Sequence, residues 1–189
     1  GCRNLQFDDC VWGGMVDAKM ATALTGRNGQ ALEDYKKRLL KLNNQVVAQA
    51  PEDLVINTHV CRGNYHSTFF SSGAYDSVAD LLFGEENVNA YYLEYDDKRS
   101  GGFAPLAKVS GDKKVVLGLI TTKIPQLEDK GKVIARIHEA EKYVPLDRLY
   151  LSPQCGFASC EIGNKLTEEE QWEKLKLVKE IAEEVWGDR

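Results

Sequence analysis

The feature that most constrains the fold of this chain is a regular alternation of apolar strands with amphipathic helices. The predicted strands are residues 5–9, 54–60, 90–95, 115–120 and 149–152. The predicted helices are residues 30–50, 75–83, 133–144 and 167–185, with a short helix at 103–109. Strands that alternate with helices form a parallel sheet with helices packed on its faces. The chain is therefore predicted to be an α/β protein of about five βα units.

The number of βα units limits which α/β architectures this chain can form. A complete (β/α)8 barrel takes about 250 residues, and 189 residues with five units are too few to close one. The spacing alone leaves two alternatives: the C-terminal part of a TIM (β/α)8 barrel, or an open α/β sheet. With no internal repeat and no linker, residues 1–189 are predicted to be a single domain. Because the chain opens on Gly1, we expect it to be cut from a longer protein.

The composition of the chain indicates which kinds of partner it can bind and in which cellular compartment it works. A net charge of −5 does not suit binding to nucleic acid. The sequence has no apolar run of the roughly 18–20 residues needed to span a membrane. Five cysteines, an odd number at irregular spacing, argue against a disulfide framework. With no secretion signal, reduced thiols in the cytoplasm are predicted.

Four metal-binding side chains follow three of the predicted strands. His59 and Cys61 are two positions apart, so on an extended chain they point to the same side. Glu94 and Cys155 come at equivalent depth on later strands. Parallel α/β folds collect function at the carboxyl ends of their strands, and zinc accepts Cys, His and carboxylate ligands. Considered one at a time, residues of these types more often have a structural role than bind a metal ion. A zinc site is favoured because all four lie at the same edge of the predicted sheet.

The same residues carry a family resemblance. The matching segments are Leu5–Asp8, Thr58–Cys61, Tyr92–Glu94 and Leu149–Phe157. Together they resemble the catalytic domain of cobalamin-independent methionine synthase, and above all its shorter single-barrel homologues. The similarity runs over essentially the whole chain. It implies that the chain covers about barrel strands four to eight.

The resemblance also implies a chemistry. His59, Cys61, Glu94 and Cys155 would hold a catalytic zinc ion, and Asp8 would bind the amino group of homocysteine. The implied reaction is transfer of a methyl group to the homocysteine thiol, giving methionine, from 5-methyltetrahydrofolate or a related donor. A metal-bound thiol is deprotonated outright. Two thiolates and one carboxylate outweigh Zn²⁺ by one negative charge, which should keep a bound sulfur nucleophilic.

One departure from the family concerns the methyl donor. Where the family has a proton-transferring His after the seventh strand, this chain reads Thr-Thr-Lys at 121–123. Either Lys123 replaces that His, or the donor is not a folate polyglutamate. His66 is a candidate for the substrate pocket and Cys160 a weaker alternative to Cys155, whereas Cys10 and Cys2 are predicted to be packing residues.

Two other functions stay open at this point. The first is a metal-free enzyme of the same barrel superfamily, similar to uroporphyrinogen decarboxylase. The second is a zinc-binding fragment without catalysis, which the short length of the chain favours. An exposed edge of a partial barrel also predicts self-association.

Overall fold

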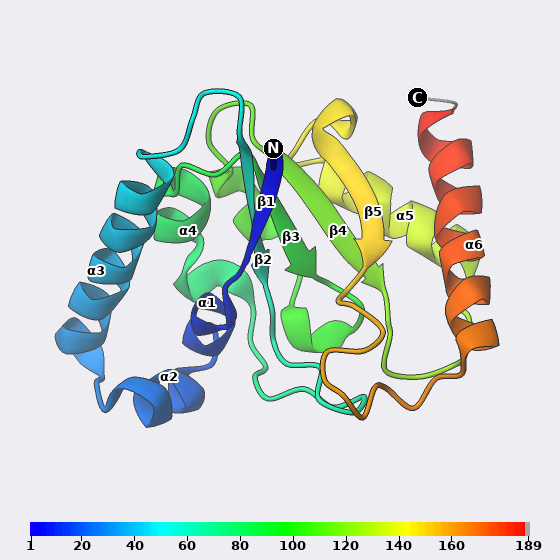
Figure 1. Ribbon diagram of the computed structural model, residues 1–189, viewed down its shortest axis with the longest axis horizontal. Helices are drawn as coiled ribbons and strands as arrows, with labels where there is room; N and C mark the ends of the chain where they lie inside the picture. The colour runs from blue at the N-terminus through cyan, green and yellow to red at the C-terminus, as the bar shows by residue number, and fades with distance from the viewer. Residues whose placement is uncertain (188–189) are drawn as a thin grey trace.

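The computed structural model describes residues 1–187 and contains one five-stranded sheet (Figure 1). All neighbouring strands pair in parallel, and their order in the sheet is their order in the sequence. This consecutive order is that of a (β/α)8 barrel, whereas a doubly wound sheet reverses its order at a switch point. The strands are β1 (Asn4–Asp8), β2 (Val55–Val60), β3 (Ala90–Glu94), β4 (Lys114–Ile120) and β5 (Leu149–Pro153).

Helices connect the strands and cover one side of the sheet. The α-helices are α1 (Cys10–Met15), α2 (Ala18–Thr25), α3 (Gly29–Val47), α4 (Ala79–Glu85), α5 (Lys130–Glu141) and α6 (Glu168–Trp186). Four 3₁₀ turns complete the chain: η1 (Tyr75–Ser77), η2 (Lys98–Ser100), η3 (Ala104–Lys108) and η4 (Leu146–Arg148). No helix within residues 1–187 has the length and apolarity to cross a membrane. The helices predicted at 75–83 and 103–109 correspond to η1 with α4 and to η3.

The apolar core lies between the sheet and its helices. Residues of β2, β3 and β4 supply its centre, and those of α4, α5 and α6 close it from outside. β1 and β5 form the two edges of the sheet, and most of their residues are exposed or half-buried. The other face of the sheet is hollowed, with pockets lined by side chains from all five strands. The carboxyl ends of the strands lie at the bottom of Figure 1, and residues at these ends line one of the two pockets.

The buried face of α3 differs from the predicted apolar stripe. The three-to-four spacing of Leu39, Leu42 and Val46 in the sequence predicts that they lie on that stripe. Leu42 and Val46 are instead 54% and 59% exposed. Lys36 is buried instead, because its ammonium pairs with Glu33 at 2.8 Å and donates to the carbonyl of Ser77 at 3.0 Å. A long side chain with its charge satisfied can thus replace an apolar residue in a helix–helix contact.

The spacing of Thr167 and Glu170 in the sequence predicts a capping box at the start of the last helix, and the structure confirms it. Thr167 and Glu170 form a capping box, in which each side chain accepts a hydrogen bond from the backbone of the other. Trp186 packs against the core and donates to the carbonyl of Leu146 at 3.0 Å. The spacing of Trp172 with Leu175 and Val178 predicts that Trp172 lies on the core side of this helix. That prediction is wrong, because Trp172 is 58% exposed. It lies in the second turn of α6, where its Nε1 atom donates to Glu168 Oε1 at 3.3 Å.

Candidate metal centre

The candidate centre is assembled from the carboxyl ends of three strands of the sheet, β2, β3 and β5. His59 lies in β2, Glu94 is the last residue of β3, and Cys61 directly follows β2. Cys155 comes two residues after β5. One ligand atom from each of these four side chains can be chosen so that all lie within 4.8 Å of one another. The structure therefore brings together the four residues that the sequence placed at separate strand ends.

The donor atoms fit a zinc ion. The set offers two sulfurs, one imidazole nitrogen and one carboxylate oxygen, which are the atoms that zinc prefers. His59 is only 7% exposed, and its Nε2 atom has no hydrogen-bond partner in the part of the chain that the structure describes. The same atom lies 4.0 Å from Glu94 Oε1. A buried ring nitrogen without a partner costs free energy, and a metal bond would relieve that cost.

The buried thiol of Cys61 and the half-buried thiol of Cys155 have opposite tendencies to ionise. A hydrogen bond from Cys61 lowers the pKa of Cys155 even though burial opposes ionisation. The same interaction, reinforced by burial, raises the pKa of Cys61. Burial alone would lower the pKa of His59, but Cys155 and Glu94 outweigh it and raise that pKa. The pocket thus favours positive charge beside the Cys155 thiolate, which is the electrostatic setting that a cation requires.

Glu94 is fully buried and held by several hydrogen bonds. Its Oε1 atom accepts the backbone N–H of Arg62 at 2.8 Å, and its Oε2 atom accepts Arg99 Nη2 at 3.0 Å. Arg99 also binds Asp96 at 2.8 Å and contacts Asp97. Burial raises the pKa of Glu94, while the charge of Lys123 and the Arg62 N–H act in the opposite direction. The sequence analysis missed Arg99, although its position five residues after a candidate ligand was a signal.

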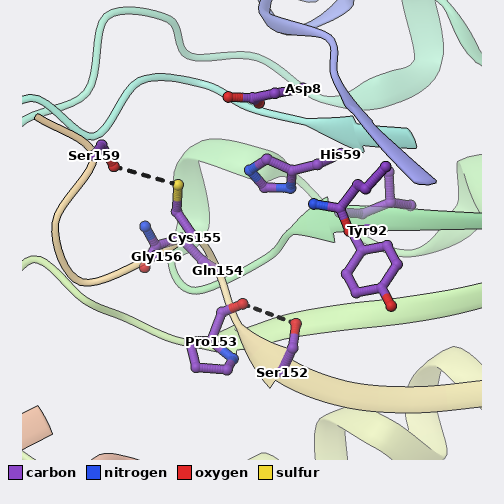
Figure 2. A pocket seen from close by; sticks show the side chains of 11 residues that line it. Asp8, His59, Tyr92, Ser152, Pro153, Gln154, Cys155, Gly156 and Ser159 are labelled. Atoms are coloured by element: carbon purple, nitrogen blue, oxygen red, sulfur yellow. Dashed lines mark hydrogen bonds between the residues drawn. The ribbon is translucent and has the colours of Figure 1, made fainter. Parts of the chain in front are cut away.

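A pocket of 420 Å³ adjoins the four residues on the hollow face of the sheet. Figure 2 shows Asp8, His59 and Cys155 facing it, with the Cys155 sulfur 3.8 Å from Ser159 Oγ. In the sheet register Asp8 pairs with His59, and His59 pairs with Tyr92. Other lining residues come from β1, β3 and the end of β5: Gln6, Leu93, Ser152, Pro153, Gln154 and Gly156. A small polar molecule in this pocket would touch the candidate ligands directly.

Two loops around the centre are joined by hydrogen bonds. Asn64, in the loop after β2, donates to the carbonyl of Gly156 at 2.7 Å and to Ser159 at 3.1 Å. Gln154 accepts the backbone N–H of Thr122 at 2.6 Å. These contacts fix the segment that carries Cys155 relative to β2 and β4. Sequence reasoning did not single out Asn64, because an Asn in a loop carries no signal of its partner.

Of the other residues that the sequence singled out, Lys123 acts on the centre, whereas His66 and Cys160 lie outside it. Lys123 has a buried Nζ atom with no hydrogen-bond partner within residues 1–187, and its charge acts on Glu94. His66 lies beside Gly163, with Nδ1 3.1 Å from that carbonyl, and does not line the pocket. Cys160 is half-buried and does not belong to the four-residue group.

Cys10 was predicted to be a packing residue, and that prediction was wrong. The side chain is exposed at the start of α1, and its sulfur lies 3.9 Å from Asp8 Oδ1. Asp8, Cys10 and Cys61 form a second group of potential ligand atoms within 4.8 Å of one another. The available signal was its spacing, two residues after the Asp at the end of the first strand.

The comparisons with known proteins agree on one family. Residues 5–184 match the family model described as the catalytic domain of cobalamin-independent synthase. The chain is 47% identical over 187 residues to the uncharacterized protein YxjG of Bacillus subtilis, and 48% identical to YxjH of the same organism. It also shares 27% identity over 101 residues with methionine synthase of Pyrococcus abyssi, 53% of this chain and 26% of that protein.

Two solved structures of methionine synthases are similar in fold to this chain. A candidate vitamin-B12-independent methionine synthase from Listeria monocytogenes matches the whole chain with a TM-score of 0.74 and 39% identity. A B12-independent methionine synthase from Shewanella sp. W3-18-1, in complex with selenomethionine, matches 98% of the chain with a TM-score of 0.72 and shows the same fold at 19% identity.

In both structures the match spans about half of the other chain, 50% and 49%, and it spans 49% of each Bacillus relative. The consecutive parallel strands match part of the barrel of these proteins, which selects the partial barrel over the open sheet. Because the family model covers nearly all of it, this chain belongs to the family of cobalamin-independent synthase catalytic domains.

Proposed function

We propose that this chain carries the zinc-binding part of a methyltransferase that transfers a methyl group to the thiol of homocysteine. His59, Cys61, Glu94 and Cys155 would hold the zinc ion. The observation that carries the proposal is the convergence of these four donors within 4.8 Å, beside a pocket open to a small molecule. The family assignment supports a methionine synthase-like activity, and the substrates are our inference.

The chemical need for a metal follows from the substrate. A free thiol has a pKa near 8.5, so only a few per cent is thiolate at pH 7. Lowering that pKa by two units needs only about 2.7 kcal/mol of differential stabilisation. When bound, a zinc ion would supply this by keeping the thiol ionised. Cys61, Cys155 and Glu94 would leave the sulfur nucleophilic, because their three charges outweigh that of the ion.

The chain's own residues would bind and orient the substrate. Asp8 pairs with His59 in the register and lines the pocket, so its carboxylate is placed to bind the ammonium group of homocysteine. Tyr92 and Ser152 line the same pocket and would exclude water beside the carbon chain. The substrate thiol would then approach the centre from the side of Cys155.

Lys123 is our candidate for the proton donor to the leaving group of a folate-type methyl donor. Its ammonium is buried, and its charge acts on Glu94, at the side of the centre next to β4. A cation there would neutralise the nitrogen that loses the methyl group by giving it a proton. His66 as a substrate-binding residue stays a prediction.

The proposal is tested by zinc content. Purified protein, stripped with chelator and reloaded, should bind one zinc ion per chain, whereas Cys61→Ser and Cys155→Ser should each lose stoichiometric binding. Cys2→Ser is the matched control, since Cys2 is an exposed thiol outside both ligand groups. Stoichiometric zinc in both of the first two variants would overturn the ligand assignment.

A second assay separates catalysis from the alternatives. Homocysteine should bind the zinc-loaded chain and not the metal-free chain, because its thiol needs the ion. A zinc site closed to thiols would indicate a non-catalytic zinc-binding fragment. A purified protein that takes up no zinc would instead favour the metal-free enzyme related to uroporphyrinogen decarboxylase.

A further inference from the structure

Cys10 places a third thiol at the edge of the proposed centre. Its sulfur lies 3.9 Å from Asp8 Oδ1, and the ligand atoms of Asp8, Cys10 and Cys61 lie within 4.8 Å of one another. This second group shares Cys61 with the first. Cys10 is therefore beside both the carboxylate proposed to hold the substrate ammonium and a sulfur proposed to hold the metal.

The backbone fixes Cys10 in this place. The N–H of Asp9 donates to the carbonyl of His59 at 2.8 Å, and the Asp9 carboxylate caps α1. One turn into α1, a Cβ built on Gly13 would lie 1.9 Å from the carbonyl oxygen of Cys61. Only a glycine permits this approach. The start of α1 is thus held against the end of β2 through backbone contacts, so the Cys10 sulfur stays near Cys61.

Glu94 is the weakest donor of the first group. Both of its oxygens already accept hydrogen bonds, one from the backbone of Arg62 at 2.8 Å and one from Arg99 at 3.0 Å. A carboxylate whose charge is partly neutralised by an arginine attracts a cation less strongly. Thiolates are also softer donors than carboxylates and compete well for zinc. The fourth coordination position is therefore the one most open to exchange.

We propose that Cys10 is a placeholder ligand, which exchanges with Glu94 at the fourth position of the metal ion and is displaced by the substrate thiol. This inference rests on the proposed function and deepens it. In the exchange, one metal–sulfur bond to Cys10 breaks and one to the substrate sulfur forms. The proton leaves the substrate thiol and ends on Cys10, so atoms and charge balance without an added reactant.

Charge explains why such an exchange suits this pocket. With Cys61, Cys155 and Cys10 as thiolates, the ion and its ligands carry one net negative charge, while the Glu94 carboxylate stays paired with Arg99. Replacing Cys10 by the substrate thiolate leaves that charge unchanged. Adding a thiolate to the Glu94-bound site would instead build a second negative charge in a largely buried space, which is costly. Asp8, beside Cys10, would hold the ammonium group of the substrate while the substrate sulfur replaces the Cys10 sulfur on the metal ion.

The experiment counts thiolates with cadmium, a zinc substitute whose thiolate bonds absorb in the ultraviolet. The reduced protein is titrated with Cd²⁺ as wild type, Cys10→Ser and, as a matched exposed-thiol control, Cys2→Ser. We expect three thiolates per ion in wild type and Cys2→Ser, and two in Cys10→Ser, so that absorption per ion falls by about one third. Adding homocysteine should leave wild type unchanged and raise Cys10→Ser by about one half.

Two results would overturn the inference. Equal absorption per ion in wild type and Cys10→Ser would mean that Cys10 does not bind the ion. Two cadmium ions per wild-type chain would mean that Asp8, Cys10 and Cys61 form a separate metal site. In either case Cys61→Ser and Cys155→Ser should still lose the absorption. If they keep it, the proposed function fails as well, so the two failures are distinguishable.

Discussion

Glu86 shows how a single buried carboxyl group couples this fold to pH. The side chain is fully buried beneath α1 and α3, and its Oε1 atom accepts Asn43 Nδ2 at 2.8 Å. Asn43 also donates to Asp9 Oδ2 at 2.9 Å. Burial raises the pKa of Glu86 to about 7, with the charge of Asp9 acting in the same direction and the Asn43 hydrogen bond against it.

A raised carboxyl pKa predicts a loss of stability with rising pH. The unfolded chain ionises near pH 4.5 and the folded chain near pH 7, so the contribution of Glu86 is complete below pH 4.5 and lost as pH rises through 7. The loss should be about 3 kcal/mol in the free energy of unfolding. Glu86→Gln removes the ionisation, so its stability relative to wild type should rise between pH 5 and pH 8.

Urea unfolding in the presence of chelator measures this effect without the metal. Glu85→Gln is the matched control, because Glu85 is exposed on the same helix. Its stability should follow that of wild type at both pH values. If the Glu86→Gln variant shows no relative gain at pH 8, the carboxyl group is already ionised in the fold at neutral pH or does not contribute.

At the scale of residues, the sequence predicted the four metal-binding residues but not the residues that surround them. His59, Cys61, Glu94 and Cys155 were found because donor type and strand-end position are both written in the sequence. Arg99 and Cys10 were not, because their roles depend on which strands become neighbours and on how tightly a short helix packs.

At the scale of elements, α1 is the segment that ties β1 to the centre. Gly13 lies against the backbone of Cys61, and Ser71 Oγ donates to the Gly13 carbonyl at 2.7 Å. The contact with Cys61 is made by backbone atoms, which cannot move aside without shifting the end of β2. The position of α1 therefore depends on the absence of a side chain at residue 13.

Gly13→Ala should separate α1 from the end of β2. The added Cβ would meet a carbonyl oxygen at 1.9 Å, so we expect a loss of about 1–3 kcal/mol in unfolding free energy and a weaker affinity for zinc. Gly131→Ala in α5 is the control: its Cβ has only a 3.4 Å contact, and alanine should stabilise a helix by about 0.5–1 kcal/mol. Thermal unfolding and a zinc competition titration check both. Equal stability of Gly13→Ala and wild type would contradict the packing argument.

The elements themselves were largely predictable. All five strands and the long helices carry clear periodicity, and the capping box marks the start of α6. Neither α1 nor α2 was predicted. In α1 the two adjacent glycines, Gly13 and Gly14, argue against a helix because glycine has a low helix propensity. The exposed side of α3 was misjudged because Lys36 is buried through specific partners rather than through apolarity.

At the scale of the whole molecule, both edges of the sheet are open. β1 and β5 each pair with a single neighbour among residues 1–187, so their outer backbone groups are available to another strand. The number of βα units left a partial barrel and an open sheet as alternatives. The family resemblance implied the partial barrel, and the comparisons bear this out. Strand order could not be read from the spacing, because consecutive and doubly wound sheets share the same alternation.

Open edges predict that this chain self-associates. An exposed row of backbone donors and acceptors is a template for pairing. Sedimentation should therefore show an average mass that rises with protein concentration. Leu5→Lys places a charge on β1 and should reduce the association, whereas Leu24→Lys, at an exposed position of α2, should not. A monomer at all concentrations would contradict this prediction.

The most direct test of the central claim is anomalous diffraction at the zinc absorption edge, from crystals of the zinc-loaded chain. Our account predicts one strong peak bonded to His59 Nε2 and to the sulfurs of Cys61 and Cys155, at about 2.0–2.3 Å. A zinc peak elsewhere, or one that is not bonded to both sulfurs, would contradict the proposed centre.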